Sequence, residues 1–164
     1  MKPMAALGLA EVFAIVDAHS ALPARDRLQL VDWLLFNYLI GNADAHAKNV
    51  AMLYGRDGRL RLAPAYDLVS TAYWPRLSER MAMKIGGENR PRWIMQRHWQ
   101  HLCDAVGLNR SQLRRRARGL IAAASTNLAK AVQSLGSDAA APLAGHFERL
   151  IAKHGRWLDE RLAG

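Results

Sequence analysis

Two aspartates and an asparagine in the first half of the chain have the side chains and the spacing to hold a divalent cation. Asp44 lies five residues before Asn49 in the polar segment NADAHAKN, and Asp67 follows in the segment LAPAYDLVST. Carboxylate and amide oxygens are hard donors of the kind that Mg²⁺ takes, commonly together with the phosphates of a nucleotide. These residue types predict a metal-dependent chemistry on phosphate groups, provided that the fold brings them together.

The order of the three residues also matches the layout of phosphoryl transfer in protein kinases, in which a catalytic Asp and a metal-binding Asn share one loop and a second metal-binding Asp follows. In this interpretation Asp44 accepts the proton of the attacking hydroxyl group, while Asn49 and Asp67 hold Mg²⁺ against the phosphates of ATP. Lys48 lies in the same loop and would neutralise charge on the transferred group.

Two neighbours, His46 and Tyr66, are candidate contacts to the nucleotide cofactor. A His in such a loop more commonly orients other groups than binds a metal, and zinc is set aside because no second His or Cys stands at ligand spacing. A purely local role for NADAHAKN stays open, because Asn and Asp are frequent in loops for their own side-chain to backbone hydrogen bonds.

A helix and a hairpin are expected to position these residues. Apolar residues at helical spacing follow Pro23, and Gly41 stands just past the last of them, which predicts a buried helix ending before the polar loop. The runs VAMLY and RLRLA flank the pair Asp57-Gly58 and predict an antiparallel hairpin over residues 50–63. Antiparallel pairing would bring Asn49 close to the segment AYD.

The second half of the sequence reads as helical. Pro91 is expected to open one helix, Asn109 or Ser111 to cap a second that Gly136 stops, and Pro142 to start a third. The chain, residues 1–164, is therefore expected to be a single domain of the mostly α class with one small antiparallel β-hairpin. The third helix would turn an apolar face inward, formed by Leu143, Phe147, Leu150, Ile151, His154 and Leu158.

Composition narrows the class of protein. With 51% hydrophobic and 23% charged residues, the 164-residue chain has the composition of a soluble globular protein rather than a disordered one. Its longest apolar run, VDWLLFNYLI, is well short of the roughly 20 residues of a membrane span, and no signal-type cleavage pattern follows the first residues. A single Cys103 forms no internal disulfide. We expect a cytoplasmic protein with no membrane partner.

The positive charge leaves a different class of function open. The net charge of +9 should attract phosphate-bearing or acidic partners. In LCDAVGLNRSQLRRRARGL a glycine separates two helical stretches as in a helix-turn-helix, and Arg114, Arg115 and Arg118 would then contact DNA phosphates. A solvated arginine face is the competing interpretation. A third possibility is a catalytically inactive helical module that only binds a partner, with tryptophans as anchors.

Several segments closely resemble the carboxy-terminal part of the HipA-family serine/threonine kinases, the toxins of bacterial toxin–antitoxin pairs. The similarity extends from about Phe13 to Leu108 and is carried by LLFNYLIGNADAHAKN, LAPAYDLVST, MAMKIGG and the tripeptide RHW at residues 97–99. It implies a helical fold like a kinase C-lobe. It also implies that Asp44 matches the catalytic Asp of the family, Asn49 the metal ligand of that loop, and Asp67 the second Mg²⁺ ligand.

The sequence departs from the wider protein-kinase pattern at two motifs. Asn42-Ala43 stand where His-Arg would precede the catalytic Asp, and Leu68-Val69 follow Asp67 in place of Phe-Gly, so ordinary activation-loop control is not expected. The chain also has neither a glycine-rich phosphate loop nor a strand with a phosphate-pairing Lys, and Gly86-Gly87 is better suited to a turn.

The resemblance thus implies a carboxy-terminal lobe whose amino-terminal, nucleotide-covering lobe is missing here, whether the chain is a fragment, a truncated gene or half of a split kinase. Alone it is expected to have little kinase activity. The implied partners are that lobe, a DNA-binding antitoxin with its operator DNA, and a protein substrate such as an aminoacyl-tRNA synthetase.

Overall fold

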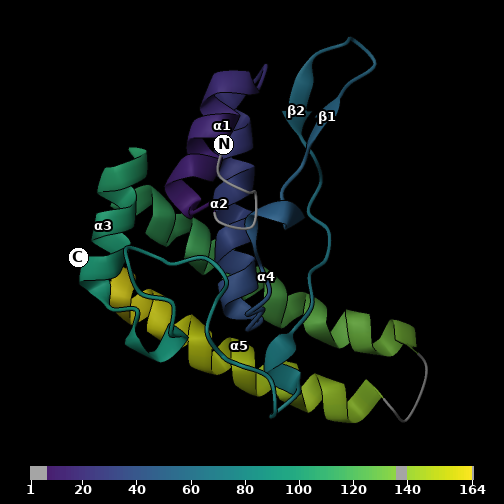
Figure 1. Ribbon diagram of the computed structural model, residues 1–164. Coiled ribbons are helices and arrows are strands. Elements are labelled where there is room, and N and C mark those ends of the chain that lie inside the picture. The colour runs from purple at the N-terminus through teal and green to yellow at the C-terminus, as the bar shows by residue number, and fades with distance from the viewer. Residues whose placement is uncertain (1–6, 136–139, 164) are drawn as a thin grey trace.

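The computed structural model describes residues 7–135 and 140–163, in which five α-helices form the body and one hairpin projects from it (Figure 1). This confirms the mostly α fold with a small antiparallel hairpin. Single 3₁₀ turns, η2 (Ala47–Asn49), η3 (Thr71–Tyr73) and η4 (Pro91–Trp93), interrupt the long connection between α2 and α3. The helices are α1 (Leu9–His19), α2 (Pro23–Leu39), α3 (Gln96–Val106), α4 (Arg110–Leu135) and α5 (Ala140–Leu162), and the strands are β1 (Met52–Tyr54) and β2 (Leu60–Leu62).

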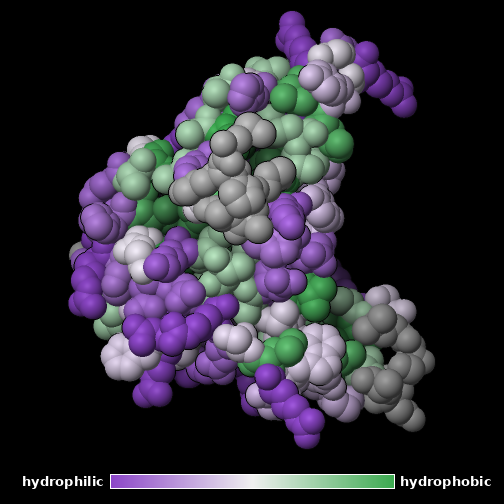
Figure 2. Space-filling model, in the orientation of Figure 1, coloured by the Kyte–Doolittle hydropathy of each residue, from purple (hydrophilic) through white to green (hydrophobic). Residues whose placement is uncertain are grey.

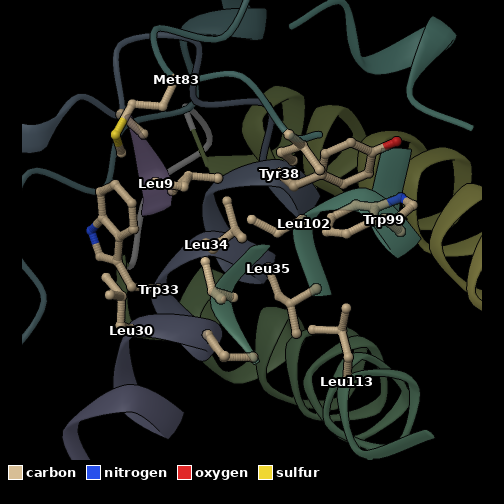
Figure 3. Close-up of a cluster of buried hydrophobic side chains, with 14 of the residues drawn as sticks. Leu9, Leu30, Trp33, Leu34, Leu35, Tyr38, Met83, Trp99, Leu102 and Leu113 are labelled. Carbon is tan, nitrogen blue, oxygen red and sulfur yellow. The ribbon is translucent and has the colours of Figure 1, made fainter. Parts of the chain in front are cut away.

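The core is organised around α2, which packs against α1, α4 and α5. Helical spacing places Leu30, Leu34 and Leu35 on its buried faces, and Tyr38 meets the ring of Trp99 edge-on at 5.6 Å between centroids (Figure 3). The predicted helix is confirmed, and it ends before Gly41, which has φ +64°. The polar loop therefore begins directly after a long helix that is anchored in the core.

The first helix, α1, was not predicted from the sequence. Its residues Leu9, Val12, Phe13 and Val16 are all buried and recur at helical spacing, so they form one face that packs on α2. No helix in the described part of the chain is long and apolar enough to cross a membrane.

A buried carboxylate, that of Asp26, anchors the hairpin to α2. It accepts hydrogen bonds from the Ser20 hydroxyl at 2.6 Å, from the Leu62 amide at 2.8 Å and from the Arg61 guanidinium at 3.3 Å. Burial raises the pKa of this carboxyl group, but the hydrogen bonds from these partners outweigh it and hold the pKa below its usual value. The carboxylate thus stays charged and fixes β2 against the start of α2.

The helical second half differs from prediction at its boundaries. Pro91 opens only the 3₁₀ turn η4, and α3 begins later, at Gln96, because the chain first has to insert the fully buried Ile94 into the core. Asn109 caps α4, since its Oδ1 accepts from the amide of Gln112 at 3.1 Å. The helix that was predicted to start at Pro142 is α5, and it begins two residues earlier, at Ala140.

Gly136 lies outside the described residues. On the inward face of α5, the side chains of Leu150, Ile151, His154 and Leu158 are buried, and those of Leu143 and Phe147 are half-buried.

The glycine pair at residues 86–87 forms a turn, as the sequence suggests. Both glycines have positive φ, and the flanking Ile85 and Glu88 form an antiparallel bridge. A Cβ atom added at Gly86 would lie 1.9 Å from the carbonyl oxygen of His98 in α3. Only glycine therefore lets the turn rest directly on α3.

Candidate active site

The hairpin brings together the two loops that carry the candidate residues. We call residues 40–51, between α2 and β1, the first loop, and residues 63–70, after β2, the second loop. Met52 pairs with Leu62 and Tyr54 with Leu60, and the Ala63 amide extends the ladder by donating to the Ala51 carbonyl at 2.8 Å. The predicted hairpin is confirmed. As a consequence, the segments that lead to Asn49 and to Asp67 leave it side by side.

A residue that sequence reasoning did not select, Asn42, joins the two loops. Its Oδ1 accepts from the amide of Asp44 at 3.0 Å, and its Nδ2 donates to the carbonyl oxygen of Asp67 at 3.2 Å. The same Nδ2 donates to Oδ1 of Asn37 in α2 at 2.8 Å, and Asn42 is 2% exposed. One buried amide thus fixes the main chain beside both candidate aspartates, and its place directly after a buried helix was the available sequence signal.

Further hydrogen bonds hold the start of the first loop. The Thr71 hydroxyl accepts from the Ala43 amide at 2.7 Å and donates to the Gly41 carbonyl at 3.0 Å. A Cβ at Gly41 would lie 2.8 Å from the Ala72 side chain, so this close approach of η3 requires glycine. On the other side, the Ala82 amide donates to the Ala43 carbonyl at 2.8 Å.

The candidate side chains differ in their exposure. The side chain of Asp44 is 72% exposed, and Lys48 and Asp67 are exposed as well. Asn49 is buried, and its Nδ2 donates to the Asp44 carbonyl at 3.3 Å. Asp67 has φ +55°, a left-handed conformation that Asp tolerates better than most residues. The two carboxylates are therefore accessible to solvent, and the main chain of the loops that carry them is held by the hydrogen bonds of Asn42.

The two candidate cofactor contacts lie in the same region. Nε2 of His46 is 3.9 Å from Oδ1 of Asp44, and the Tyr66 hydroxyl donates to the Lys48 carbonyl at 2.8 Å. Nδ1 of His46 is buried and has no hydrogen-bond partner among the described residues. Within that part of the chain, no three His, Cys, Asp or Glu side chains are grouped to hold a metal ion, and the predicted set consists instead of two carboxylates and one amide.

The arginine cluster on α4 makes several contacts within the domain. Arg114 and Arg118 lie 3.8 Å and 2.5 Å from the same Asp159 oxygen on α5, and Arg116 pairs with Asp32 of α2. Arg115 is exposed and forms no ion pair with any residue that the structure describes. Gly107, at φ +63°, turns the chain between α3 and α4.

Comparison with known proteins identifies the family to which this chain belongs. Residues 2–128 match the HipA-like C-terminal domain, and the chain therefore belongs to that family. The resemblance identified from the sequence is confirmed.

Two relatives and one solved structure show the extent of the similarity. Over 75% of its own length, the chain is 37% identical to Y4mE of Sinorhizobium fredii. Over 83% of its own length, it is 33% identical to the serine/threonine-protein kinase toxin HipA of Shewanella oneidensis. It superimposes with a TM-score of 0.80 and 26% identity, over 96% of its length, on a chain of the Shewanella oneidensis HipA, HipB and operator DNA complex. The chain spans about a third of these proteins, covering 29%, 32% and 38% of their lengths.

Proposed function

We propose that this chain supplies the catalytic and metal-binding loops of a serine/threonine protein kinase of the HipA class. The observation that carries the proposal is the pair of hydrogen bonds from Asn42 to the Asp44 amide and the Asp67 carbonyl. They tie together the two loops whose residues have the kinase order, so that the relative position of the aspartates is set by the fold. Membership of the HipA-like family supports the same assignment.

In this proposal each polar residue has one task. The exposed carboxylate of Asp44 accepts the proton of the substrate's Ser or Thr hydroxyl group. Lys48 offsets negative charge on the transferred phosphoryl group, and Asn49 and Asp67 provide oxygen ligands for Mg²⁺. This donor set suits Mg²⁺, which takes one or two carboxylates and completes its shell with water and phosphate oxygens. ATP, when bound, supplies the γ-phosphoryl group.

The amino-terminal lobe of the class is proposed to cover the nucleotide from the side of the hairpin. Large apolar side chains are exposed on β1 and on the second loop, namely those of Leu53, Tyr54, Leu68 and Val69. Exposed apolar side chains of this size suit elements that another domain covers. His46 lies in the first loop and Tyr66 in the second, and both would contact the covered nucleotide.

The assignment can be tested in a fusion of this chain to the amino-terminal part of Y4mE. We expect ATP- and Mg²⁺-dependent phosphorylation by the fusion and little from the chain alone. Asp44→Asn and Asp67→Asn should each reduce the rate at least about a hundredfold, the scale of a lost general base or metal ligand. Asn is chosen at residue 67 because it also tolerates positive φ.

Asp104→Asn is the matched control, because Asp104 is an exposed aspartate on α3, outside the hairpin and the two loops. Its rate should equal that of the unmodified fusion. Full activity of either variant at Asp44 or Asp67 would refute the site, and robust turnover by the isolated chain would refute the need for a second lobe.

A second candidate function, contact with DNA or with an antitoxin, is favoured by the similarity to a protein solved with HipB and operator DNA. We infer that α4 could present Arg114, Arg115 and Arg118 to a phosphate backbone. The ion pairs with Asp159 already occupy two of these side chains, which leaves Arg115 as the one most available for such a contact.

A further inference from the structure

A hollow of about 1000 Å³ lies between α5 and the connection that precedes α3, next to the first loop. Its lining includes Asn42 and Ala43, which directly precede Asp44, and Tyr38 from α2. A second hollow, of about 720 Å³, shares Met95, Arg97, Trp157 and Arg161 with it. We call the two together the basic groove. Hydrophilic side chains gather on the face where this connection crosses α5 (Figures 1 and 2).

Positive charge dominates the first hollow. Arg92, Arg97, Lys153 and Arg161 line it, against a single carboxylate, that of Glu79, and the second hollow adds one cation, Arg110, and one carboxylate, Glu160. None of these four cations forms an ion pair with a residue that the structure describes, in contrast to the arginines of α4. Four positive charges gathered around one carboxylate repel one another, and a negatively charged ligand would relieve that repulsion.

Two of the cations are held in place by neutral groups. The guanidinium of Arg161 donates to the carbonyl oxygens of Pro91, Ile94 and Arg92 at 2.8–3.0 Å, which orient it but leave its charge uncompensated. The ring of Trp157 lies 4.7 Å from the Arg161 guanidinium carbon and 4.9 Å from the Lys153 ammonium. Contacts within the domain therefore position two of the positive charges of the groove, those of Arg161 and Lys153.

Apolar groups stand beside these charges. The side chains of Trp93 and Met95 line the groove and are 57% and 43% exposed. A large exposed aromatic ring and a flexible thioether next to cations suit a peptide that carries both carboxylates and apolar side chains. Duplex DNA would use the charges, but its bases are stacked inside the double helix and would gain little from these apolar side chains, whereas a single strand could stack on Trp93 and is therefore included in the test below.

We propose that the basic groove binds an acidic segment of the protein substrate. Asn42 and Ala43 line the groove, and the exposed Asp44 carboxylate follows them in the chain, so a peptide in the groove would pass close to the catalytic base. That the bound protein is the substrate rests on the proposed kinase function. The preference for an acidic peptide rests only on the groove.

The test measures binding to the full chain without nucleotide, by fluorescence anisotropy of a labelled short peptide rich in Glu with one Leu and one Ser. A peptide with Gln in place of each Glu should bind at least about tenfold more weakly. The charge reversals Arg97→Glu and Lys153→Glu, both at exposed positions, should weaken binding of the Glu peptide by a similar factor.

Arg56→Glu, an equal charge reversal at the exposed hairpin turn, is the control and should leave the affinity unchanged. Equal weakening by this control, or equal binding of the Glu and Gln peptides, would overturn the proposal. So would a single-stranded oligonucleotide that binds more tightly than the peptide and is released by Arg97→Glu. Because the assay needs no phosphoryl transfer, an inactive fusion protein that still binds the peptide would count against the kinase assignment alone.

Discussion

At the scale of single residues, His154 shows how packing sets a protonation state. Its ring is buried, stacks on Trp157 at 5.1 Å and lies with Nδ1 2.8 Å from the Tyr38 carbonyl oxygen. Burial lowers the pKa of this imidazole from 6.5 to about 4, although the hydrogen bond to the Tyr38 carbonyl opposes the shift. The neutral ring is therefore part of the folded core at physiological pH.

This shift predicts a pH dependence of stability. Between pH about 6.5 and about 4 the unfolded chain binds a proton at His154 that the folded chain excludes, so stability falls as the pH is lowered through this window. From pH about 7 to about 5 the loss due to His154 should be about 2 kcal/mol. Urea unfolding at the two pH values measures it. His154→Phe should flatten the dependence, whereas His101→Phe, at an exposed position on α3, should not. An unchanged slope in His154→Phe would contradict the assignment.

At the scale of elements, Asp26 joins the hairpin to the helical body. Asp26→Asn keeps the size of the side chain but removes the charge that accepts from Leu62 and Arg61. We expect a loss of about 3 kcal/mol in the free energy of unfolding, because buried donors lose a charged acceptor. Urea denaturation measures this loss, and hydrogen exchange of the β1 and β2 amides should show that the hairpin loosens. Asp57→Asn should change neither, and protection unchanged in Asp26→Asn would show that the hairpin does not depend on this carboxylate.

The elements that could be predicted from the sequence are those specified by neighbouring residues. The periodicity of α2 and the Asp57-Gly58 turn are local signals, and both elements were located correctly. The hydrogen bonds from Asn42 to Asp67 and from Thr71 to Gly41 join residues far apart in the chain, so no local sequence pattern predicts them. The start of α3 was misplaced for a related reason, since burial of Ile94 is a tertiary requirement that overrides the helix-starting preference of proline.

At the scale of the whole molecule, the excess of positive charge predicts binding to duplex DNA that weakens steeply between low and physiological salt. Replacing Arg114, Arg115 and Arg118 by Ala should remove most of it. Asp159→Asn should instead raise the affinity, because it releases the two arginines that Asp159 now neutralises. Fluorescence anisotropy over a salt series separates these outcomes. If the affinity for DNA is negligible at low salt, or does not respond to any of these substitutions, DNA binding by the arginines of α4 is refuted. Their role would then be to join α4 to α5 and α2 through ion pairs.

The contact of Gly86 with α3 bears on how a saturation mutagenesis screen of this domain should be interpreted. Every substitution there would place a Cβ atom 1.9 Å from the His98 carbonyl oxygen, on a backbone at φ +55°. We expect Gly86→Ala to unfold the domain or to lower its melting temperature strongly, because two causes of strain add. Gly58→Ala, at φ +72° with open space around it, should show the backbone cost alone. In a screen scored by activity, position 86 would therefore be as intolerant of substitution as the two aspartates proposed to be catalytic, and only a parallel measurement of protein abundance would distinguish it from them. Equal thermal stability of the two alanine variants would disprove this interpretation.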